Sequence, residues 1–128
     1  MCIRDSKEGQ EVHRFRSGDP ITVEIDYKTK EQDLLGNIGI SIFRNDEILC
    51  YTTNSKMAKN HYMPLKNEGK VVIELSNNNL VPGEYLLDTY IHSVDGFPFD
   101  DIKGVARFEV TGMKTAEGIC NLNAQWQE

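Results

Sequence analysis

Polar and hydrophobic residues alternate along much of the chain, and this period of two is typical of β-strands with one buried face. In the segment 21–27, apolar residues at the odd positions alternate with polar or charged residues at the even positions. Five further strands are predicted at 38–43, 48–53, 71–75, 85–91 and 105–110. No segment has a sustained helical period, and 55–66 is expected to be mainly a loop with room for one helical turn.

Turn-forming residues separate these predicted strands. Ser17–Pro20 precedes the first strand, Arg44–Glu47 joins the second to the third, and Asp95-Gly96 follows the fifth. Asn, Asp and Gly tolerate the backbone angles of turns, and Pro fixes the backbone angle φ at a value that turns use. Short strands separated by such turns predict an all-β fold, an antiparallel β-sandwich whose two sheets bury their apolar faces against each other. Residues 113–128 are less patterned, and we expect a final strand or a tail there.

The length and the charge narrow the class of protein. The chain has 128 residues, which suits one domain that needs no metal or disulfide for stability. Its 14 Lys and Arg against 20 Asp and Glu give a net charge of −6, which argues against binding nucleic acid or an anionic membrane. The longest apolar run, Ile48–Tyr51, is too short to cross a membrane, and no secretory signal is expected.

The sequence lacks the common signatures of catalysis, metal binding and cofactor binding. Phosphate-binding loops, dinucleotide-binding glycine motifs, nucleophile elbows and zinc-protease motifs are missing, so no catalytic residue, metal or cofactor is predicted. The three cysteines, Cys2, Cys50 and Cys120, are widely spaced, which predicts free thiols in a reducing compartment. Cys50 or Cys120 would act as a nucleophile only with a histidine beside it in space.

The side chains that point outward from three predicted strands form a surface of rings and polar groups. If the apolar positions of 38–44, 84–92 and 105–110 face the core, Phe43 and Tyr90 face solvent beside charged and hydroxyl-bearing residues. Sugars suit such a surface, because their C–H faces stack on aromatic rings and their hydroxyls need placed donors and acceptors. A half-exposed sheet face, or one covered by a subunit partner, would show the same pattern.

Eight residues are therefore the candidates for contact with a glycan. Three of them carry rings expected to stack on sugars, namely Phe43, Tyr90 and Tyr51. The other five are expected to form hydrogen bonds with sugar hydroxyls, namely Ser41, Asn54, Asp88, His92 and Arg107. Because each hydroxyl exchanges water for protein at a small net gain, we expect a modest affinity.

Several segments, taken in order and spacing, match a known family. They are Phe15–Tyr27 (FRSGDPITVEIDY), Gly39–Arg44 (GISIFR), Tyr51–Ser55 (YTTNS), Leu80–Asp88 (LVPGEYLLD) and Phe108–Val110 (FEV). Together they resemble the C-terminal domain of Wzt-type ATPases, which belong to ABC transporters that export O-antigen and related polysaccharides. The resemblance extends from about Gly9 to Trp126, nearly the whole chain.

The resemblance implies an immunoglobulin-like β-sandwich that binds a lipid-linked polysaccharide of the O-antigen type on the cytoplasmic side of the inner membrane. It also implies a homodimer that works with an ATPase domain and a membrane-spanning transporter subunit, through which it is peripheral to the membrane. The ATPase domain is missing from these 128 residues, so we expect no nucleotide binding. We interpret 1–128 as a single polysaccharide-binding domain, with 1–11 as a linker or first strand, and as a fragment rather than a stand-alone relative.

Two aromatic residues have expected structural roles within this domain. Tyr85 follows Pro82-Gly83, and we expect it to pack inward with its hydroxyl satisfied by nearby backbone. We expect Trp126 to plug the core at the end of the last strand rather than to serve as an exposed stacking platform, because buried Trp needs only one partner for its N–H.

Two alternatives to non-catalytic glycan binding stay open from the sequence. In the first, the same sheet face pairs subunits in a protein-interaction module and binds no sugar. In the second, the domain is a small glycoside-active enzyme that uses Asp88 with Asp95 or Asp100 as paired carboxylates. Asp95, Asp100 and Asp101 would also permit a calcium site, although Asp95-Gly96 is equally what a plain turn would contain.

Overall fold

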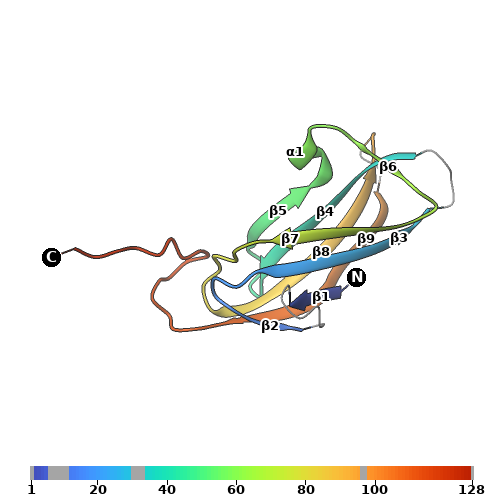
Figure 1. The fold of residues 1–128 in the computed structure, drawn as a ribbon. Coiled ribbons are helices and arrows are strands. Elements are labelled where there is room, and N and C mark those ends of the chain that lie inside the picture. Colours follow the sequence, from blue (N-terminus) through green and yellow to red (C-terminus); the bar gives the residue numbers. More distant parts are fainter. Residues whose placement is uncertain (1, 6–11, 30–33, 96–97, 128) are drawn as a thin grey trace.

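Two β-sheets form the body of the molecule in the computed structural model (Figure 1), which describes residues 2–5, 12–29, 34–95 and 98–127 and, at 2, 4, 5 and 98–105, the backbone alone. Within these residues the smaller sheet has the order β1-β3-β7, with β1 at Cys2–Asp5, β3 at Ile21–Lys28 and β7 at Glu68–Leu75. The larger sheet has the order β2-β9-β8-β4-β5, and β6 pairs with β4 beside this path. Its strands are β2 (Arg14–Arg16), β4 (Leu34–Arg44), β5 (Leu49–Asn54), β6 (Met63–Leu65), β8 (Gly83–Ser93) and β9 (Pro98–Thr111).

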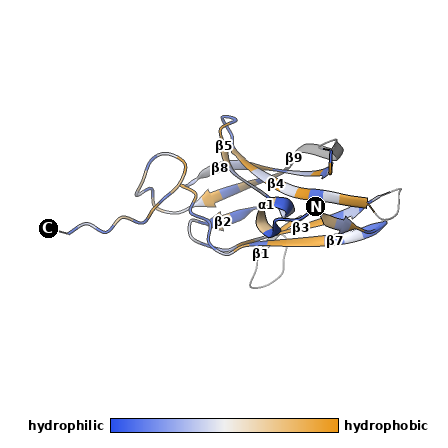
Figure 2. Ribbon diagram, turned by 90° about the horizontal axis from the view of Figure 1, so that it is seen from above, coloured by the Kyte–Doolittle hydropathy of each residue, from blue (hydrophilic) through white to orange (hydrophobic). Residues whose placement is uncertain are grey.

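The two sheets lie one above the other (Figure 2), which confirms the predicted β-sandwich. Their strands pair antiparallel except β2 and β9, which run parallel. The alternation in the sequence corresponds to the burial. The odd positions of β3 from Ile21 to Tyr27, the even positions of β4 from Ile38 to Ile42 and the odd positions of β8 from Tyr85 to Ile91 are all buried. These side chains fill the space between the layers, where removal from water stabilises the fold.

Tyr85 is buried in this core near the start of β8, and it packs inward as predicted. Its side chain is 1% exposed, its ring stacks on Phe108 at a centroid distance of 5.5 Å, and its hydroxyl donates to the Val81 carbonyl at 2.6 Å. A buried hydroxyl costs free energy unless it finds an acceptor. The turn that precedes β8 supplies that acceptor, so the Pro-Gly-x-Tyr motif ties the turn to the core.

The segment after β5 holds a short helix where mainly a loop was expected. Helix α1 spans Ser55–Lys59; the side chain of Asn54 accepts a hydrogen bond from the Met57 N–H at 2.8 Å, and Asn60 ends the helix with φ at 59°. Asparagine suits both positions, because it caps helix N-termini and tolerates the left-handed conformation. The three-residue strands β2 and β6 were not predicted, since such short segments show no readable alternation.

The C-terminal segment leaves the sandwich as a tail rather than a final strand. Near its start, the Val81 N–H donates to the Ile119 carbonyl, and Cys120 makes an isolated bridge with Leu80. Beyond that point the chain projects away from both sheets (Figure 1). Trp126 is 92% exposed, so the expectation that it plugs the core is wrong. It lies beyond the last contacts with the sandwich and has no core position to occupy.

Within the described part of the chain, no helix has the length and apolar character needed to cross a membrane.

Candidate functional site

The solvent-facing side of the larger sheet, called the outer face below, carries most of the candidate residues. The pairing of β4, β8 and β9 arranges them in rows across the sheet. Phe43 lies opposite Leu86, and Leu86 lies opposite Arg107. Asp88 lies opposite Ser41 in the next row. Tyr90 and His92 follow along β8, and each alternates with a buried residue. Strand register therefore brings together, from three strands, residues that are up to 66 positions apart in the sequence.

Tyr90 is held in a defined orientation at one end of the outer face. It pairs with Gly39 across β4 and β8, and a Cβ at Gly39 would overlap its ring, so the ring lies directly over the glycine. The Asn54 side-chain amide donates to the Tyr90 hydroxyl at 3.1 Å, and the His92 ring lies 4.8 Å from the Tyr90 ring. Because Gly39 has no side chain, the Tyr90 ring can pack directly against the backbone of the sheet at this position.

Asn54 and Ser41, both expected to bind sugar hydroxyls, form defined hydrogen bonds within the protein. Asn54 accepts from the Met57 N–H through Oδ1 and donates to Tyr90 through Nδ2, so both ends of its amide are engaged. Ser41 Oγ lies 3.0 Å from Thr52 Oγ1, and that Thr52 hydroxyl donates to the Ile40 carbonyl. Asn54 is therefore a positioning residue for Tyr90, whereas Ser41 keeps acceptor capacity toward solvent.

Tyr51 does not join the other candidates. It pairs with Ile42, which is 3% exposed and faces the core, so Tyr51 lies on the opposite side of the larger sheet from Phe43 and Tyr90. There it lines a cavity of about 360 Å³ at the open edge of the sandwich, together with Cys50 and Leu75. The structure thus separates Tyr51 from the other seven candidates.

A recess at the Glu84 end of the outer face contains residues that the sequence analysis did not select. It has a volume of about 260 Å³ and is bordered by His13, Asn45, Glu84, Glu109 and the predicted Arg107. Glu84 and Glu109 follow the same outward alternation as their neighbours, so extending that pattern by one pair would have found them. His13 precedes a three-residue strand, and no pattern in the sequence marks its position.

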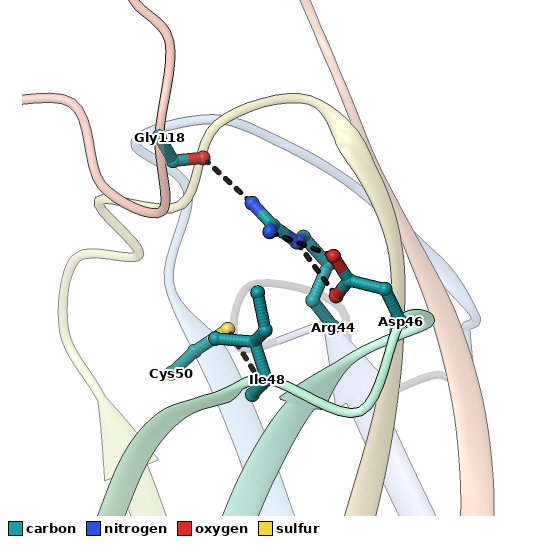
Figure 3. Close-up of polar contacts among 5 residues, drawn as sticks. All are labelled: Arg44, Asp46, Ile48, Cys50 and Gly118. Carbon is teal, nitrogen blue, oxygen red and sulfur yellow. Dashed lines mark hydrogen bonds and ion pairs between the residues drawn. The ribbon is translucent and has the colours of Figure 1, made fainter.

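A network around Arg44 connects the β4–β5 hairpin to the start of the tail (Figure 3). Arg44 donates to both carboxylate oxygens of Asp46, at 2.8 and 2.7 Å, and to the Gly118 carbonyl at 3.1 Å. The hydrogen bonds from Arg44 lower the pKa of Asp46. Burial raises the pKa of the nearby Cys50 thiol, which is the opposite of the activation a nucleophilic cysteine needs. This network has the character of a structural anchor.

A metal-binding site finds no support in the part of the chain that is described. That part contains no group of three or more His, Cys, Asp or Glu side chains arranged to hold a metal ion. The side chains of Asp100 and Asp101, and the residue Gly96, lie outside the described part, so those expectations stay untested.

The comparisons with known proteins agree with this architecture. A family model described as the Wzt C-terminal domain matches residues 1–122. Among solved structures, a crystal structure of the C-terminal domain of Wzt is similar, with a TM-score of 0.83 and 18% identity over 99% of this chain and 80% of that one. At this identity the structural likeness shows the fold alone. No curated protein matches the sequence.

Proposed function

The chain belongs to the Wzt C-terminal domain family, and from this premise we propose that it binds a bacterial surface polysaccharide of the O-antigen type without altering it. Family membership implies a role in an O-antigen ABC transporter, and the proposed role is recognition of the transported glycan. One observation carries the proposal. Tyr90, held by Asn54 over Gly39 and beside His92, presents a half-buried ring on the outer face, on the same strand face as Asp88.

The arrangement suits reversible recognition of a sugar chain. The rings of Phe43 and Tyr90 would pack against the C–H faces of sugar rings, while Asp88 and Arg107 would accept from and donate to hydroxyls. Positioning by Asn54 means that Tyr90 loses little side-chain freedom on binding, which favours affinity. Each contact is weak by itself, so a long glycan that crosses several rows of the outer face would bind better than a short one.

Titration of the chain with polysaccharide purified from the surface of its source organism tests the proposal. Tyr90→Ala should weaken binding about 5–30-fold, the effect of losing an aromatic anchor worth about 1–2 kcal/mol. Tyr51→Ala is the matched control, because it removes the same side chain from the other side of the sheet, and it should change affinity less than about twofold. Absence of binding at millimolar sugar would refute the proposal, as would equal losses in both variants.

We further propose that the chain acts as a homodimer attached to an ATPase domain and a membrane-spanning subunit, peripheral to the inner membrane. The tail supports a contact with a second copy or another partner, because Met113, Leu122 and Trp126 are 85%, 84% and 92% exposed. A dimer would add avidity to the modest affinity of one outer face. Light scattering should give the mass of two chains, and Trp126→Ala should shift it toward one.

The rings of Phe43 and Tyr90 on the outer face also favour a second candidate function, a protein-interaction module in which this face pairs subunits and binds no glycan. In that case Phe43→Ala or Tyr90→Ala would reduce dimerisation, and neither the unmodified chain nor the variants would bind polysaccharide. If the outer face binds glycan, the same variants should stay dimeric and lose sugar affinity, so the two functions make opposite predictions for one pair of variants.

A further inference from the structure

The recess at the Glu84 end of the outer face has the size and the mixture of groups expected of a small ligand site. Its volume of about 260 Å³ lies just below the range of about 300–1,000 Å³ typical of pockets for drug-sized ligands, so it suits a single sugar ring. It is bordered by side chains from separate parts of the chain, namely the segment before β2, the β4–β5 turn, β8 and β9. Leu86 contributes an apolar surface between the polar groups.

The charged groups of the recess are arranged in a way that the fold does not require. The register places Glu84 directly opposite Glu109, and like charges in such a pair destabilise a sheet. Arg14 compensates Glu109 through an ion pair at 3.3 Å. Neither the Glu84 carboxylate nor the Arg107 guanidinium forms a hydrogen bond or an ion pair with any other residue that the structure describes. A carboxylate and a guanidinium that lack partners among the described residues thus border one small recess.

These two groups complement a pair of neighbouring sugar hydroxyls. An ionised carboxylate only accepts hydrogen bonds, and a guanidinium only donates them. A hydroxyl can do both, so a diol can donate to Glu84 while its oxygens accept from Arg107. The hydrogen bonds are charge-assisted, and they are stronger than those between neutral groups. A carboxylate or phosphate on the sugar would accept from Arg107 but would also place a second negative charge against Glu84, in a chain whose net charge is already −6.

We propose that this recess is a subsite for one uncharged sugar residue, recognised through its hydroxyls by Glu84 and Arg107, and that it discriminates against acidic sugars. The inference rests on the proposed function and adds the chemical class of the sugar residue that the domain selects. It also assigns a binding role to Glu84, which lies outside the eight residues selected from the sequence.

The test compares the affinity of the chain for chemically matched forms of the polysaccharide from its source organism. One form has its carboxyl groups reduced and is free of them; the other has its primary hydroxyls oxidised to carboxylates. The unmodified chain should bind the carboxyl-free form at least about tenfold more tightly. Glu84→Gln should weaken binding of the carboxyl-free form about tenfold and should narrow the preference between the two forms. Glu68→Gln, on the exposed surface of the smaller sheet, is the control and should change neither.

The outcomes separate this inference from the function on which it rests. Equal or tighter binding of the carboxylated form, or a Glu84→Gln variant that behaves like the control, would overturn the subsite and leave glycan binding standing. Failure of the unmodified chain to bind either form would refute the proposed function, and the subsite with it. The thermal unfolding transition of Glu84→Gln shows whether this variant is as well folded as the unmodified chain. Arg107→Gln is a second variant that should also weaken binding of the carboxyl-free form.

Discussion

Gly39→Ala should impair glycan binding while leaving the fold nearly as stable as before. Gly39 lies in the middle of β4, on the outer face and directly beneath the Tyr90 ring. An added methyl group would overlap that ring, and the Tyr90 side chain, which is only half-buried, can respond by rotating toward solvent. The rotation would break the hydrogen bond from Asn54 and remove the ring from its place on the outer face.

The expected change in stability is small because two contributions oppose each other. Replacing a glycine within a strand by alanine stabilises the folded state by about 0.5–1 kcal/mol. Loss of the Asn54–Tyr90 hydrogen bond costs about 0.5–1.5 kcal/mol. The free energy of unfolding should therefore change by less than about 1 kcal/mol, whereas the affinity for glycan should fall about 5–30-fold, as for Tyr90→Ala.

Gly69→Ala is the matched control because the smaller sheet repeats the arrangement on its buried side. A methyl group at Gly69 would overlap the Tyr27 ring, which is only 8% exposed and cannot rotate out of the core. Overpacking of this kind costs about 1–3 kcal/mol, but the site is remote from the outer face. Urea unfolding and glycan titration of both variants give the result. The reasoning is refuted if Gly39→Ala binds glycan normally, or if it destabilises the protein as much as Gly69→Ala does.

Three further predictions concern the core, the hairpin network and the thiols. Tyr85→Phe leaves a buried backbone carbonyl without its donor and should lower the free energy of unfolding by about 1–3 kcal/mol, measured in urea; no loss would exclude the hydrogen bond. Because the hydrogen bonds from Arg44 lower the pKa of Asp46, their stabilisation should be present above the ordinary value of 3.8 and be lost as the pH falls through the lowered pKa. An NMR titration of the Asp46 carboxyl group with a midpoint above 3.8 would contradict this prediction. Burial raises the pKa of Cys50, so iodoacetamide should alkylate the exposed Cys120 first, which peptide mass spectrometry can follow; the reverse order would contradict the burial.

The sequence was sufficient to predict the sandwich and most of the outer face, because strand alternation and burial follow the same period. Phe43, Tyr90 and His92 lie where that alternation places them. Strand alternation does not give the correct side of the sheet for Tyr51. A bulge between Ile42 and Phe43 shifts the pairing of β5 by one residue, so the parity of β5 reverses along the strand. No residue type near Ile42 and Phe43 indicates this bulge in the sequence.

The remaining differences arise from contacts between segments that are distant in the sequence. Trp126 was expected in the core on the basis of its residue type, but burial depends on whether the chain returns to the sandwich, and it leaves instead. The packing of the Tyr90 ring over Gly39 could not be predicted, because it depends on the register between β4 and β8. Likewise, the recess at Glu84 requires β8, β9 and the segment before β2 to meet at one end of the sheet.

Mapping the glycan onto the two sheets tests the central claim most directly. Amide chemical shifts of the isotope-labelled chain would be recorded during titration with polysaccharide from its source organism. We expect the largest changes along β4 and β8, at Phe43, Leu86, Asp88 and Tyr90, and little change in β3 and β7. Changes concentrated in the smaller sheet or in the tail, or none with saturating glycan, would contradict the assignment of the outer face as the polysaccharide-binding surface.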